Sequence, residues 1–400
     1  MCSALGTLAI ASVGLAPGAA AEDIQPKQWY LKTMAADELW KYSTGKGVKV
    51  AVIDTGVNSA TSTLKGQVLT HQVPEAVGYK ATKDSDGHGT AMAEVIAGTG
   101  AGGGVKGLAP DAKIIPIHVQ FLKDKYDGKF PLPAEAIRAA ADSDAKIISM
   151  SFGSPYRSVE EAEAVKYAAS KGKLMFASIG NSGEKGKGEY PGIYPYVVGV
   201  SAIDKSGTVA KFSTKSNYVD FAAPGVHVPG WCDGTFTRYC DTDGTSSATA
   251  LASASAALVW SAHPDWTANQ VLRTLIDTAG RSWAKDKPST YLGYGILRPR
   301  RVLINKDIDP GPAGSDPLAA ENGTAPGKDA KAGGGSSAAP SSGASTRPTR
   351  NAGSASGPTS AAKDTDSGGS TQTWVVIGAA AAVLLIGGAG FAVLRARRNA

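Results

Sequence analysis

Short apolar runs alternate with helix-forming stretches through residues 22–305 of the chain. Five runs are continuous enough for buried strands, and they cover residues 48–53, 114–119, 147–150, 174–178 and 197–200. Between them, residues 134–141 and 159–169 have helical composition. Strands that alternate with helices form a parallel sheet covered on both faces, so the pattern predicts an α/β domain. We expect functional side chains at the carboxyl ends of its strands.

A longer apolar run lies close to the end of the sequence. Residues 374–394 carry no charge, and a run of this length can cross a hydrocarbon core about 30 Å thick. Three arginines follow at once: Arg395, Arg397 and Arg398. The positive-inside rule then predicts a single-pass cell-membrane protein with a basic cytoplasmic tail, residues 395–400, and an extracytoplasmic domain. A buried Ala/Gly-rich core helix is the alternative.

The first residues and the segment before the apolar run fit this topology. Residues 1–21 are small and apolar and end in three alanines, which predicts a signal peptide, although its basic n-region is missing. Residues 310–373 are dominated by Gly, Ala, Ser, Thr, Pro, Lys and Asp, with Leu318 as their one leucine. That composition predicts a disordered linker. Residues 22–309 remain for one globular domain.

Charge and cysteine content narrow the class of protein further. The net charge of +6 comes from 41 basic and 35 acidic residues that form no basic stripe, which argues against nucleic-acid binding. Cys232 and Cys240 are close neighbours in a loop-like stretch. In an exported protein they are expected to form a disulfide that closes a small hairpin or loop. Two reduced thiols are the alternative.

Three polar residues are candidates for catalysis. Asp54 directly follows the first predicted strand, where it can orient a histidine or simply cap a loop. His88 lies between two glycines at the start of a predicted helix, a context that presents the ring. Ser246 begins a long run of small residues, so its hydroxyl would lie near free backbone N–H groups. Ser247 competes for this role, and either serine could be a helix N-cap.

The order Asp, His, Ser is that of subtilisin. The blocks DTGV, DGHGT and GTSSA resemble the three signature blocks of subtilisin-type serine peptidases, and the match runs from about residue 29 to 303. The resemblance implies a subtilisin-like three-layer fold and a serine endopeptidase that cleaves protein or peptide substrates. Ser246 would attack the carbonyl, His88 would take its proton, and Asp54 would hold the ring.

Further residues of this chain match functional positions of the same family. Asn181, in ASIGNSG, matches the asparagine of the oxyanion hole, with the backbone N–H of Ser246 as second donor. Ser151, Phe152 and Gly153 match the segment that pairs with the substrate backbone and walls the P1 pocket. No cofactor is implied, and calcium dependence stays open because no calcium-binding loop stands out. Ala91, Ser247 and Ala250 depart from common family residues and leave fine specificity open.

The overall arrangement points to one subfamily. Residues 22–47 are too few for a folded propeptide, and they resemble the approach segment of the core itself. The chain resembles the mycosins, which are anchored proteases associated with type VII secretion, in its order of segments: signal peptide, peptidase domain, linker, membrane helix and basic tail. That resemblance implies an extracytoplasmic processing peptidase with type VII membrane components as partners. A general surface subtilase, and a structural stabiliser of a secretion complex with secondary catalysis, are the alternatives.

Overall fold

The computed structural model describes residues 23–119, 129–324 and 359–360. The predicted signal peptide, membrane helix and cytoplasmic tail, and most of the predicted linker, therefore lie outside the described residues. Within the described ranges, no helix has both the length and the apolar character that a membrane span needs.

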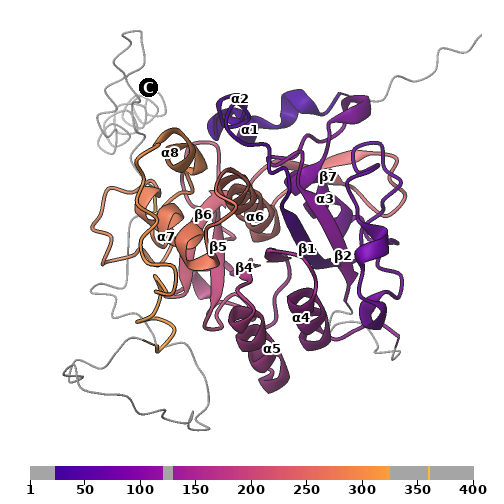
Figure 1. Ribbon diagram of the computed structural model, residues 1–400. Helices are drawn as coiled ribbons and strands as arrows, with labels where there is room; N and C mark the ends of the chain where they lie inside the picture. Colours follow the sequence, from indigo (N-terminus) through magenta and orange to yellow (C-terminus); the bar gives the residue numbers. More distant parts are fainter. Residues whose placement is uncertain (1–22, 120–128, 325–358, 361–400) are drawn as a thin grey trace, which may run out of the picture. The chain divides into compact units, whose positions relative to one another are not determined.

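A six-stranded parallel sheet forms the centre of the domain, in the order β2-β1-β3-β4-β5-β6 (Figure 1). Its strands are β1 (Lys49–Asp54), β2 (Lys113–His118), β3 (Ile147–Met150), β4 (Leu174–Ser178), β5 (Val197–Ile203) and β6 (Val219–Pro224). The predicted α/β class and parallel sheet are confirmed. The sixth strand was not predicted, because Asp220 interrupts its apolar run. Asp220 is buried, and its carboxylate accepts a hydrogen bond from Gly199 N–H at 2.8 Å.

Alternate residues of the strands supply two separate cores. Val50 and Val52 of β1 face the core that contains helices α3 and α6, whereas Ala51 and Ile53 face the core that contains α4 and α5. The sheet therefore lies between two helical layers (Figure 1). The helices are α1 (Trp29–Thr33), α2 (Ala36–Leu39), α3 (His88–Ala97), α4 (Pro133–Asp142), α5 (Val159–Ser170), α6 (Thr245–Ala262), α7 (Ala268–Thr278) and α8 (Pro299–Ile304).

The N-terminal segment packs onto the domain as one of its parts. Tyr30 and Leu39, in α1 and α2, are fully buried in the core that holds α3 and α6. The indole of Trp29 donates a hydrogen bond to the carbonyl of Val226 at 2.9 Å. These contacts agree with the interpretation of this segment as an approach to the core rather than a separate domain.

The predicted linker begins too early. Residues 310–324 form turns against the domain, so the prediction of disorder is wrong for this stretch. Leu318 is only 2% exposed, and the side-chain oxygen of Asn322 accepts a hydrogen bond from Tyr196 N–H at 2.9 Å. Composition alone underestimates the order of such a short stretch. A few contacts with an already folded surface are enough to offset the small entropy cost of ordering it. The ordered domain therefore extends beyond residue 309 to at least residue 324.

Candidate active site

Asp54 and His88 form a hydrogen-bonded pair at the carboxyl-end edge of the sheet. Asp54 is the last residue of β1 and fully buried, and His88 is the first residue of α3. The Nδ1 atom of His88 lies 2.7 Å from Oδ1 of Asp54, and the backbone N–H of Thr55 donates to the same oxygen at 2.8 Å. The His88 side chain remains one-third exposed, at 33%. The carboxylate thus orients a ring that is still accessible from outside.

The two glycines beside His88 serve different purposes. Gly87 has a φ of +95°, a left-handed conformation in which the chain turns into the helix. A Cβ at Gly89 would lie 2.2 Å from the carbonyl oxygen of Gly56 and 3.0 Å from Cβ of Asp54. Only glycine therefore lets the first turn of α3 approach the end of β1 closely enough for the Asp54–His88 contact.

The surroundings of His88 favour its charged form. Burial lowers the pKa of the ring, but the charge and hydrogen bond of Asp54, with smaller contributions from Asp86 and Asp84, outweigh burial and raise the pKa to about 9. A general base must be neutral to accept a proton. The arrangement therefore provides a base whose neutral fraction grows as the pH rises into the alkaline range.

Asp84 organises the loop that presents His88. One of its oxygens accepts hydrogen bonds from the hydroxyl of Thr55 at 2.9 Å and from Gly87 N–H at 2.9 Å. The other accepts from the N–H and the hydroxyl of Thr90, at 2.9 and 2.7 Å. The Thr55 hydroxyl in turn accepts from Gly89 N–H at 2.8 Å. This network ties the end of β1 to the start of α3 and so fixes the distance between Asp54 and His88.

Burial distinguishes Ser246 from its neighbour. Both serines lie in the first turn of α6, but Ser247 is only 2% exposed whereas Ser246 is partly exposed. The hydroxyl of Ser246 donates to the carbonyl of Ser151 at 3.1 Å, so it is directed toward Ser151 rather than His88 in this structure. Catalytic hydrogen bonds are often long or misaligned before substrate binds. Ser246 is thus the serine that a substrate can reach.

Thr245 fixes the orientation of Asn181. The side-chain oxygen of Asn181 accepts hydrogen bonds from the N–H and the hydroxyl of Thr245, at 3.0 and 2.9 Å. Because both bonds use the oxygen, the two N–H groups of the amide remain as donors. Ser246, the next residue, has a backbone N–H in the first helical turn, where no intrahelical acceptor exists. The two predicted oxyanion donors are therefore held beside the Ser246 hydroxyl.

A disulfide-closed hairpin packs against the His88 loop. Strands β7 (Val228–Trp231) and β8 (Tyr239–Thr242) are antiparallel, and the predicted disulfide Cys232–Cys240 is present, with the two Cα atoms 5.1 Å apart. Gly234, between the two cysteines, lies so close to the loop that a Cβ there would be 2.2 Å from the carbonyl oxygen of Ser85. The hairpin thereby supports the segment that positions His88.

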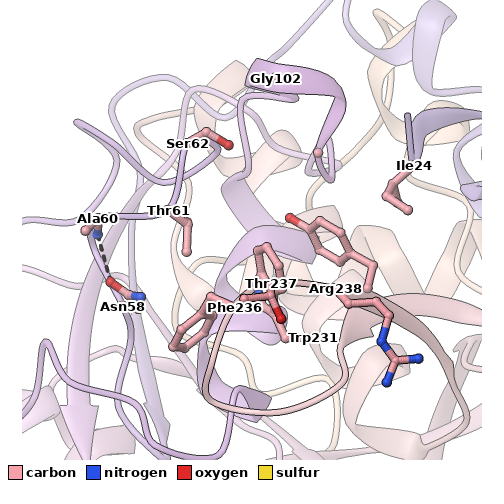
Figure 2. Close-up of a pocket in the computed structure, with 12 residues that line it drawn as sticks. Ile24, Asn58, Ala60, Thr61, Ser62, Gly102, Trp231, Phe236, Thr237 and Arg238 are labelled. Carbon is pink, nitrogen blue, oxygen red and sulfur yellow. Dashed lines mark hydrogen bonds between the residues drawn. The ribbon is translucent and has the colours of Figure 1, made fainter. Parts of the chain in front are cut away.

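Residues of this hairpin line part of a pocket of about 450 Å³. The rings of Trp231 and Phe236 pack edge to face at 5.4 Å and lie between Asn58 and Ile24 (Figure 2). None of Asp54, His88 and Ser246 lines it. The lining residues are Ile24, Asn58, Ala60, Thr61, Ser62, Gly102, Gly104, Trp231, Phe236, Thr237, Arg238 and Tyr239.

Comparison with known proteins agrees with this geometry. Residues 45–295 match the Subtilase family of peptidases. The chain belongs to this family. It is 32% identical to thermitase of Thermoactinomyces vulgaris over 275 residues, which are 66% of this chain and 95% of thermitase.

Solved structures of subtilases are also similar to this domain. The MycP3 protease from the type VII (ESX-3) secretion system covers 74% of this chain and 90% of its own, with 28% identity and a TM-score of 0.58. MycP1 with its N-terminal propeptide removed covers 71% of this chain and 99% of its own, with 27% identity and a TM-score of 0.59. The protein is therefore a subtilisin-type serine peptidase whose fold has mycosin neighbours.

The structure of this subtilase adds three residues that its sequence did not single out. Asp84 is one of several aspartates before His88, and spacing alone does not distinguish them. Thr245 directly precedes the predicted nucleophile, and nothing in the sequence gives it a role of its own. Glu189 lies next to Gly153, in the segment predicted to wall the P1 pocket, although 36 residues separate the two in the sequence. Only the fold brings these side chains to the site.

Proposed function

We propose that Ser246, His88 and Asp54 are the nucleophile, the general base and the orienting carboxylate of this peptidase. The observation that carries the assignment is the 2.7 Å contact between Asp54 and His88, and Ser246 is the accessible serine in the first turn of α6. In the reaction that we propose, the Ser246 side chain rotates so that its hydroxyl turns from Ser151 to Nε2 of His88. The ring then takes the proton as Oγ attacks the substrate carbonyl, and Asp54 stabilises the imidazolium.

Two further groups complete the proposed mechanism. The amide N–H of Asn181 and the backbone N–H of Ser246 would bind the oxyanion of the tetrahedral intermediate. Ser151, Phe152 and Gly153, which follow β3, would pair with the substrate backbone as an added strand. His88 would next donate its proton to the leaving amine, and water would release the acyl group from Ser246 by the same steps.

We further propose that the chain is a mycosin-like processing peptidase, anchored in the membrane with its catalytic domain outside. The fold similarity to MycP1 and MycP3 supports a link to type VII secretion. The uncharged run of residues 374–394, followed by three arginines, supports the anchor and its orientation. An anchored peptidase would act on a restricted set of protein substrates that pass near the membrane.

Two experiments on the producing cells test this proposal. A chain that lacks residues 374–394 should move from the membrane fraction to the medium, whereas unchanged fractionation would contradict the anchor. N-termini of secreted and cell-surface proteins should then be mapped in the wild type and in Ser246→Ala. Cleavage sites that disappear in the variant identify substrates. If secretion fails only when the whole protein is deleted, and no N-terminus changes in the variant, a scaffolding role replaces processing.

A further inference from the structure

Two chain segments follow neighbouring strands at the carboxyl end of the sheet, and we call the space between them the slot. Ser151, Phe152 and Gly153 leave β3, and Ile179 and Gly180 leave the adjacent strand β4. Substrate that pairs with the first segment would place its P1 side chain between the two segments. Groups in this slot would then contact P1.

The carboxylate of Glu189 occupies this slot. A Cβ on Gly153 would lie 2.1 Å from Oε2 of Glu189, and a Cβ on Gly180 would lie 2.8 Å from its Cδ. The acidic group is thus in contact with the backbone of both walls. Glycine is required at both positions for the carboxylate to enter.

The backbone holds Glu189 from both sides. Its own N–H donates to the carbonyl of Ile179 at 3.1 Å, which ties it to the segment after β4. The next residue, Tyr190, exchanges two backbone hydrogen bonds of 2.8 Å with Ser154, which ties it to the segment after β3. The side chain is therefore directed into the slot by a fixed backbone rather than by a free loop.

The Glu189 carboxylate has no counter-charge in the part of the chain that the structure describes. Among the described residues it makes no ion pair and no side-chain hydrogen bond, although it is only partly exposed. Burial raises its pKa, and no nearby group lowers it again. A carboxylate in this state loses more water when a substrate closes the slot, and a cation that also donates hydrogen bonds stabilises it best.

We propose that Glu189 selects lysine or arginine as the P1 residue of the substrate. An ammonium or guanidinium group at the end of a long side chain would pair with the carboxylate and replace its lost water. An apolar P1 side chain would cover an unpaired charge, and an acidic one would be repelled. The inference rests on the proposed pairing of substrate with Ser151–Gly153 and names the substrate class of that same site.

Matched peptides that differ only at P1 test the assignment. We would measure kcat/KM for acetyl-Ala-Ala-Pro-X-coumarin amides with X as Lys, Phe, Glu or Ala, on the purified full chain. The wild type should prefer Lys to Phe, and Glu189→Gln should lower that preference about 10- to 100-fold, the range expected for a lost hydrogen bond to a charged group. Glu189→Lys should reverse the order of Lys and Glu. Glu163→Gln, an exposed change on α5, is the control and should leave all ratios unchanged.

The pH dependence gives a second readout. The titration of His88 affects the Lys and Phe peptides equally, so it cancels in the ratio of their kcat/KM values. A decrease of this ratio at acidic pH therefore reports protonation of Glu189. A preference for Ala that Glu189→Gln leaves unchanged would overturn the proposal, because the side chain then merely fills the slot. So would an equal loss on all four peptides. Labelling with a fluorophosphonate, which has no P1 side chain, distinguishes an error in the catalytic roles from an error in the P1 assignment. Unlabelled wild type would contradict the catalytic roles as well, whereas normal labelling without charge selection would contradict the P1 assignment alone.

Discussion

The Asp54→Asn substitution removes the charge nearest to His88 with little change of volume. The carboxylate and its 2.7 Å contact, together with weaker charges nearby, raise the pKa of the ring to about 9 against the opposing effect of burial. The amide of asparagine carries no charge and so cannot stabilise the imidazolium in the same way, whereas burial still lowers the pKa of the ring. The pKa of His88 in the variant should therefore fall to its ordinary value of about 6.5 or below.

The size of the effect on catalysis follows from the neutral fraction of His88. With a pKa of about 9, roughly 1% of the rings are neutral at pH 7 and half at pH 9, so kcat/KM of the wild type should rise about 50-fold over that interval. In Asp54→Asn the profile should be flat there. Its kcat should be lower by about 10⁴, because the ring is no longer held in the required tautomer.

Two assays check these numbers. NMR titration of the ring protons follows the protonation of His88 directly, and peptide hydrolysis between pH 6 and pH 10 gives the profile. Asp144→Asn serves as the control, since Asp144 is an exposed partner of Lys49 near the amino end of β3. A His88 midpoint that stays in place in Asp54→Asn, or a wild-type profile that is already flat above pH 7, would refute the electrostatic account.

Four other predictions concern the wild type and single sites. The stabilisation that His88 gains from its raised pKa is complete below pH 6.5 and is lost as the pH rises through 9, so chemical denaturation should show about 1–2 kcal/mol less stability at pH 10 than at pH 6, after allowance for solvent screening. Asn181→Ala should lower kcat by about 10²–10³ with little change in KM, measured on one peptide; an unchanged kcat would remove it from the oxyanion site. Replacing both Cys232 and Cys240 with serine should lower the free energy of unfolding by about 2–3 kcal/mol; a fully stable variant would contradict the bracing role of the hairpin. Leu318→Ala should cost about 2–3 kcal/mol in urea unfolding, whereas no cost would mean that residues 310–324 do not pack on the domain.

Sequence patterns predicted most of the sheet because its central strands are buried on both faces. Such strands are continuous apolar runs, and five of the six were predicted within a few residues of their bounds. The exception, β6, contains Asp220, whose buried carboxylate is paired with a backbone N–H of the neighbouring strand. A pattern of single residues cannot detect that partner. Residues 310–324 were misjudged for a similar reason, since their order depends on a surface formed elsewhere in the chain.

The site residues also differ in how far the sequence around them predicts their roles. Asp54, His88 and Ser246 have local signals, namely a strand end, two glycines and a helix start. Choosing Ser246 over Ser247 on structural grounds required their burial, because adjacent serines in one helical turn look alike in sequence. Glu189 had no local signal at all. Its position depends on how the segments after β3 and β4 come together.

Active-site labelling shows whether Ser246 is the nucleophile. The full chain would be treated with a fluorophosphonate, digested and mapped by mass spectrometry, alongside Ser246→Ala and the neighbouring control Ser247→Ala. If Ser246 is the nucleophile, the wild type and Ser247→Ala each carry one adduct, on Ser246, and Ser246→Ala carries none. An adduct that persists in Ser246→Ala, or a folded wild type that takes up no label, would contradict this role.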